Sequence, residues 1–127
     1  MTQAQELVER RIHKRYPVED GAYAALKGEV NKLGQIMDIS EGGLSFRYID
    51  IGDRPKDTFE IDIYVESNNG FSLEGLATRS MSDREILKKV PFSSIVMRRH
   101  SVRFEHLSKN HLAQLQYFIN HHVRDKG

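Results

Sequence analysis

The chain has 127 residues, 39% hydrophobic and 29% charged, the composition of a globular domain large enough to bury its own core. It contains no cysteine, which excludes thiol catalysis, disulfides and cysteine-ligated metals. Lys and Arg number 19 and Asp and Glu 18, whereas proteins that bind long nucleic acids through charge carry a broad positive excess. The sequence shows neither a signal peptide nor a long apolar run, so we expect a cytoplasmic protein.

A basic cluster stands near the start of the chain. The stretch ERRIHKRYP, residues 9–17, holds Arg10, Arg11, His13, Lys14 and Arg15. Pro17 disfavours helical conformation at Tyr16, so a short helix over residues 3–15 has to end there, or the segment is extended. We predict an arm over residues 1–17 that is mobile when no ligand is bound. Taken alone, such a cluster is typical of a solvated charged segment.

Short extended segments follow the arm. We predict strands over 21–30, 33–40, 43–49, 58–66, 71–80 and 94–106, separated by turn sequences such as EGG and SNNG. In FEIDIYVE, Phe59, Ile61, Ile63 and Val65 recur at every second position, which indicates a strand with one buried face. Six strands without intervening helices predict an antiparallel barrel or sandwich.

The end of the chain changes to a helical period. Ser108 can cap a helix whose apolar stripe comprises Leu112, Leu115, Phe118, Ile119 and Val123. We therefore predict a single domain with three parts: the arm at 1–17, the strands at 18–107 and a helix at 108–127.

The sequence MDISEGGLSF, residues 37–46, offers a partner for the basic cluster. In a strand, Asp38 and Ser40 share one face, and we expect Met37 and Ile39 to face the core. The turn at 42–43 is glycine in both positions, which permits positive φ or the close approach of a ligand or another backbone. Residues 16–37 are enough to form a strand and a second strand antiparallel to it. The basic cluster and residues 37–46 can therefore lie at the same end of a hairpin.

Together these side chains favour a guanine-like or phosphate-bearing anion. Arginine donates two hydrogen bonds to phosphate or to the O6/N7 edge of guanine. The carboxylate of Asp38 can accept from the N1 and N2 donors of guanine. The residues alone do not distinguish between these ligands.

The two motifs together resemble a known family. Arg11-Ile-His-Lys-Arg15 followed by Asp38-Ile-Ser40-Glu-Gly-Gly43 is similar to the PilZ signature, RxxxR followed by [DN]xSxxG. The resemblance extends over residues 8–123. It implies a six-stranded antiparallel β-barrel with a C-terminal helix that binds the bacterial second messenger cyclic di-GMP.

The resemblance also implies roles for individual residues. Arg11 and Arg15 would contact phosphates and guanine Hoogsteen edges. Asp38 and Ser40 would hydrogen-bond a guanine from the barrel wall, and Gly43 would keep the surface open for the base.

Further expectations concern stoichiometry and signalling. Arg10 matches the additional arginine of family members that bind two stacked ligand molecules. The arm would fold over the ligand and change the surface that a downstream protein partner meets.

Other functions have weaker support in the sequence. We find no nucleophile–base motif, no phosphate-binding loop and no metal-like spacing of histidines, so we expect no enzyme activity, cofactor or metal. A second basic patch, at Met97–His100, is typical of a solvated strand face. Two alternatives to the receptor remain open: a ligand-independent interaction module of the same fold, and an RNA-binding barrel.

Overall fold

The structure, a computed structural model, describes residues 14–27, 32–52, 54–66, 70–86 and 95–124. Within these ranges the chain forms seven strands and one helix. They are β1 (Tyr16–Pro17), β2 (Ala22–Leu26), β3 (Lys32–Ile39), β4 (Gly43–Ile49), β5 (Thr58–Val65), β6 (Phe71–Ile86), β7 (Met97–Phe104) and α2 (Lys109–His121).

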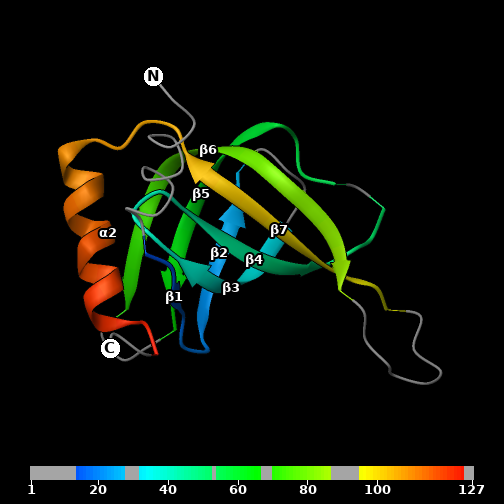
Figure 1. Cartoon of the computed structure of the whole chain (residues 1–127), viewed down its shortest axis with the longest axis horizontal. Helices are drawn as coiled ribbons and strands as arrows, with labels where there is room; N and C mark the ends of the chain where they lie inside the picture. Colours follow the sequence, from blue (N-terminus) through cyan, green and yellow to red (C-terminus); the bar gives the residue numbers. More distant parts are fainter. Residues whose placement is uncertain (1–13, 28–31, 53, 67–69, 87–94, 125–127) are drawn as a thin grey trace, which may run out of the picture.

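Six of the strands close into an antiparallel barrel (Figure 1). The order around it is β3, β2, β5, β6, β7 and β4, and β4 pairs back with β3. The additional strand, β1, pairs with the last residues of β3. The predicted six-stranded barrel is therefore confirmed, and the alternative of an open sandwich is excluded because β3 and β4 close the ring.

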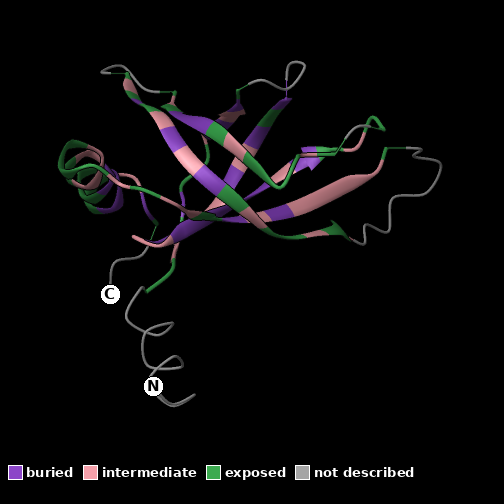
Figure 2. Cartoon of the chain, turned by 90° about the horizontal axis from the view of Figure 1, so that it is seen from above, coloured by how far each residue is buried: buried purple, intermediate pink, exposed green. Residues whose placement is uncertain are grey.

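Inward-facing residues of the barrel strands form the core (Figure 2). Leu44, Phe46 and Tyr48, which occupy alternate positions of β4, are all buried. A Cβ atom added to Gly34 on β3 would lie 2.4 Å from the Phe46 ring. Glycine at this position makes room for Phe46, a fully buried phenylalanine, whose burial stabilises the fold by about 3 kcal/mol.

A bulge in β3 changes the face on which its side chains lie. The pairing of β3 with β4 shifts register between Ile36 and Asp38. Consequently Ile36 and Ile39 are buried, and Met37 is only half-buried. The prediction that Met37 faces the core was wrong, because an extra residue in one strand interrupts the two-residue period.

Strand β6 is longer than its sequence indicates. The predicted strand ended at residue 80, but β6 continues to Ile86 and pairs there with the first half of β7. Its register shifts between Ser80 and Ser82. The added segment is rich in polar residues, and one of them, Asp83, turns towards the interior.

Helix α2 packs beside the barrel (Figure 1). It begins after Ser108, whose side chain accepts a hydrogen bond from the His111 amide at 3.0 Å, as predicted. Leu115, Phe118 and Ile119 are its buried residues. No helix in the described ranges combines the length and apolar character needed to cross a bilayer.

Candidate ligand site on the barrel wall

The described end of the basic cluster lies beside the second motif at the end of β3. Strand β1 pairs with β3 so that Pro17 lies opposite Asp38, which brings Arg15, two residues earlier, beside the same carboxylate. The Arg15 guanidinium donates to Asp38 Oδ1 at 2.8 Å. The structure thus joins one residue of the basic cluster to one residue of the second motif.

A second arginine, from β7, holds the other carboxylate oxygen. Arg99 Nη2 donates to Asp38 Oδ2 at 2.6 Å and to Ser45 Oγ at 3.0 Å. The Asp38 side chain is left only 19% exposed between its two arginines. Arg99 belongs to the second basic patch, which we expected to be merely solvated.

The order of the strands explains this contact. Strand β4 lies between β3 and β7, so Arg99 reaches across Ser45 to Asp38. The spacing of residues in the sequence carries no signal for this contact, because it depends on which strands are neighbours in the closed barrel. The only available hint was the concentration of arginines at the start of the β7 segment.

Ser40 is committed to the turn between β3 and β4. It is buried, and its Oγ accepts hydrogen bonds from the amides of Gly42 and Gly43 at 3.0 and 3.2 Å. The Ser40 amide in turn donates to the Gly43 carbonyl at 2.8 Å. The described contacts of Ser40 therefore fix the turn that follows Asp38, and a contact with ligand stays a prediction.

Gly43 allows another backbone to approach closely. A Cβ atom at this position would lie 2.2 Å from the Val102 carbonyl oxygen of β7. The described glycines with positive φ are Gly21, Gly52, Gly70 and Gly75, so the turn at 42–43 does not use that conformation. Of the two expected reasons for glycine here, the structure supports close backbone contact.

Arg10 and Arg11 lie outside the described residues. Their position relative to Asp38 is therefore a prediction that rests on the sequence.

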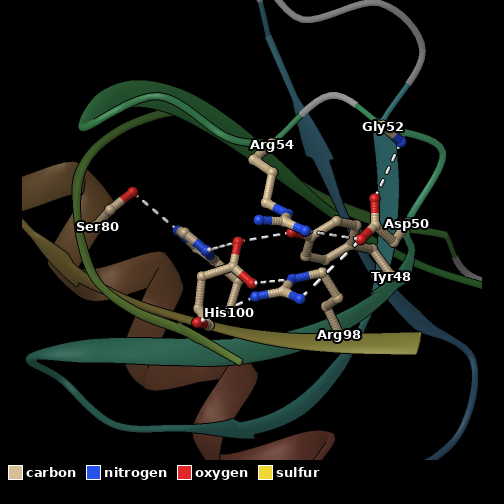
Figure 3. A network of polar contacts seen from close by, with 8 residues as sticks. Tyr48, Asp50, Gly52, Arg54, Ser80, Arg98 and His100 are labelled. Atoms are coloured by element: carbon tan, nitrogen blue, oxygen red, sulfur yellow. Dashed lines mark hydrogen bonds and ion pairs between the residues drawn. The ribbon is translucent and has the colours of Figure 1, made fainter. Parts of the chain in front are cut away.

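A second polar network crosses the interior of the barrel near β7 (Figure 3). Asp83 of β6 accepts hydrogen bonds from Tyr48 Oη at 2.6 Å, Arg98 Nε at 2.6 Å and His100 Nδ1 at 3.1 Å. His100 Nε2 lies 2.8 Å from Ser80 Oγ. The network ties together β4, β6 and β7.

Burial and hydrogen bonding set the charges in this network. Burial would raise the pKa of Asp83, but the hydrogen bonds from Tyr48, Arg98 and His100 outweigh it and hold that pKa below its ordinary value. Burial lowers the pKa of His100 and raises the pKa of Tyr48. Burial thus favours a neutral imidazole and a neutral phenol beside the Asp83–Arg98 ion pair.

Ser80, His100 and Asp83 have the connectivity of a hydrolytic triad, yet their surroundings do not suit catalysis. His100 is 2% exposed, and Ser80 Oγ also lies 2.6 Å from the Lys56 carbonyl oxygen, to which it donates. A catalytic histidine has to exchange a proton with a bound substrate. This network instead satisfies buried polar groups and cross-links three strands.

Comparison with solved structures supports the fold. The chain is similar to the PilZ domain of YcgR from Escherichia coli, a structure with c-di-GMP, at a TM-score of 0.65 and 19% sequence identity. The similarity covers 87% of this chain and 89% of that domain. No family model matches the sequence, and no curated protein does. The chain therefore has a PilZ-like fold, and ligand binding has to be argued from its own residues.

Proposed function

We propose that this protein is a cyclic di-GMP receptor that signals to a protein partner. The observation that carries the proposal is the contact between Arg15 and Asp38 at 2.8 Å. It joins the second arginine of the first signature motif to the aspartate of the second motif, on the outer wall of a PilZ-like barrel. The neighbouring structure with c-di-GMP supports the same ligand class.

Each side chain has a chemical task in this proposal. Arg15, together with Arg11, donates to phosphates and to guanine O6 and N7. Asp38 accepts from guanine N1 and N2. Ser40 and Gly43 belong to the site mainly through the turn they build, which fixes the backbone after Asp38. Recognition of this kind requires neither a cofactor nor catalysis.

The arm provides the signal. We propose that residues 1–17 close over the ligand and that the altered surface recruits a partner protein, in the cytoplasm of a bacterium. Ligand-driven change of this kind requires that the ligand contact the closed arrangement more favourably than the open one. Arg15 provides such a differential contact, because it can bind either Asp38 or the ligand.

Calorimetric titration of the purified protein with cyclic di-GMP tests the proposal. We expect a Kd in the micromolar range or tighter for the unaltered protein. Arg11→Ala, Arg15→Ala and Asp38→Ala should each weaken binding by about tenfold or more, since a good bidentate contact contributes roughly 1–3 kcal/mol.

Arg54→Ala is the matched control. The Arg54 side chain is 54% exposed, much like that of Arg15 at 51%. It pairs with Asp50, which follows the end of β4 that is far from Asp38. Arg54→Ala removes the same charge as Arg15→Ala, but it should leave the affinity for cyclic di-GMP unaltered. Absence of cyclic di-GMP binding by the unaltered protein would reject the receptor and favour a ligand-independent interaction module. Steeply salt-dependent binding to single-stranded RNA would favour an RNA-binding barrel instead.

A further inference from the structure

Asp38 is shared between two arginines that come from different elements. Arg15 precedes β1 and donates to Oδ1, and Arg99 belongs to β7 and donates to Oδ2. Each carboxylate oxygen therefore accepts a hydrogen bond from one of the two arginines. Each carboxylate oxygen has two acceptor sites, so a guanine base that presents N1–H and N2–H to Asp38 either shares the carboxylate with these donors or displaces one of them.

The two arginines are held unequally. The Arg99 side chain is 31% exposed and lies on an eight-residue strand that is paired on both sides, with β4 and with β6. The Arg15 side chain is 51% exposed and lies beside β1, a strand of two residues. An exposed ion pair contributes little to stability, so the Arg15 contact opens more easily.

Ser45 gives Arg99 a second anchor. Its hydroxyl is buried on β4 and accepts from the same guanidinium nitrogen, Arg99 Nη2, that binds Asp38. Arg99 thus connects Asp38 to a fixed point on the barrel wall. The direction of the Asp38 carboxylate follows from this connection and from the backbone of β3.

We propose that Arg99 is a positioning residue that determines guanine specificity. In this inference, which rests on the proposed function, Arg15 leaves Asp38 Oδ1 when cyclic di-GMP binds and donates to the ligand instead. Arg99 and Ser45 keep Oδ2 in place, so the carboxylate presents Oδ1 to the N1 and N2 donors of the base. The signature motifs do not include this residue; its position is a consequence of barrel closure.

A neighbouring arginine, Arg47, provides a control that distinguishes the loss of positioning from the loss of charge. Arg47 of β4 lies directly opposite Arg99 in the β4–β7 pairing, but its guanidinium donates to Gln35 Oε1, at 2.9 and 2.6 Å. Arg47→Gln and Arg99→Gln therefore remove the same charge from almost the same place. Only the second substitution removes a hydrogen bond to Asp38.

The test compares two ligands by calorimetry on the full chain. The first is cyclic di-GMP, and the second is its hypoxanthine analogue, cyclic di-IMP, which lacks the N2 amino group. We expect the unaltered protein and Arg47→Gln to prefer cyclic di-GMP by about tenfold, and Arg99→Gln to bind both ligands with nearly equal affinity. If Arg99 has only a structural or electrostatic role, Arg99→Gln should lower the affinity for both ligands equally and leave the preference for cyclic di-GMP unchanged.

Each outcome decides one question. If the unaltered protein binds cyclic di-GMP and Arg99→Gln keeps the preference, the inference fails and the proposed function stands. If the unaltered protein binds both ligands equally, Asp38 does not read N2 and the inference fails as well. If it binds neither, the proposed function fails and the inference fails with it. If circular dichroism shows that Arg99→Gln does not fold, Ser45→Ala takes its place. We then expect a smaller loss of the preference for cyclic di-GMP.

Discussion

Two aspartates of this barrel have equally shielded side chains but different partners. Asp38 and Asp83 are each 19% exposed. One partner of Asp38, Arg15, is half exposed, so water can replace it. The partners of Asp83 are buried or nearly so, since Arg98 is 12% and His100 2% exposed. Loss of Asp38 should therefore affect ligand binding, and loss of Asp83 should affect stability.

Asp83→Ala tests this difference. The substitution removes the acceptor of Tyr48, Arg98 and His100 together and leaves the shielded Arg98 guanidinium with the more distant Asp50 carboxylate, at 4.0 Å. We expect the free energy of unfolding to fall by about 3–5 kcal/mol, measured by urea denaturation followed by circular dichroism. Asp20→Ala is the control. Its side chain is 81% exposed in an ion pair with Arg124, so the loss should stay below about 1 kcal/mol. Equal losses in the two variants would contradict the expectation.

At the level of elements, the described end of the arm and the residues after it contact both β3 and the end of α2. Strand β1 lies against β3, and the segment after it reaches the end of α2. The Glu19 amide donates to the His122 carbonyl at 3.1 Å, and the Arg124 amide donates to the Pro17 carbonyl at 2.8 Å. Pro17 is therefore held on both sides, and a change in the arm has to occur before it.

Hydrogen exchange tests movement of the arm. We expect cyclic di-GMP to slow exchange of the amides in residues 8–16, because the proposed closure of the arm over the ligand would protect them. Amides in the middle of β4, which are paired with β3 and β7, should be unaffected and act as an internal reference. Unchanged exchange in the arm at saturating ligand would exclude the proposed switch, whatever the affinity.

The sequence predicted those elements whose pattern is local. Strand β5 follows a two-residue period and α2 has a cap and an apolar stripe, so the position of β5 and the start of α2 were correct. The predicted end of the helix was wrong, because α2 ends at His121 and Val123 instead forms a bridge with Val18. The continuation of β6 to Ile86 was missed because polar residues there pair with β7 and Asp83 turns inwards. Arg99 was missed as a site residue for a similar reason. Its contact with Asp38 arises from strand order, which no local pattern encodes.

At the scale of the whole molecule, positive charge is balanced overall and concentrated locally. The net charge is only +1, yet Arg15 and Arg99 converge on one carboxylate, and Arg10 and Arg11 precede them in the chain. A local cluster of this kind suits a small polyanion better than an extended phosphate backbone. It also offers enough donors for more than one ligand.

We expect the calorimetric stoichiometry to be two cyclic di-GMP molecules per chain. Arg10→Ala should reduce it to one, because the added negative charge of the second ligand then lacks a partner. Lys14→Ala is the control, since Lys14 Nζ lies over the Tyr16 ring at 5.4 Å and is not part of the motif; it should keep both ligands. Saturation of the unaltered protein at one ligand would reject the stacked pair.

The pairing of β4 with β7 has a consequence for how the chain folds. Strands β3 and β4 form a hairpin from neighbouring residues, but β4 and β7 are far apart in sequence, so the loop that their pairing closes is long and slow to form. Asp38 and Arg99, separated by 61 positions, meet only after that pairing. An intermediate with β3 and β4 formed but the ring still open would already possess Asp38 and lack the donor that orients it. If Arg99 orients Asp38 as proposed, guanine selectivity requires the pairing of β4 with β7 and is absent until the barrel closes.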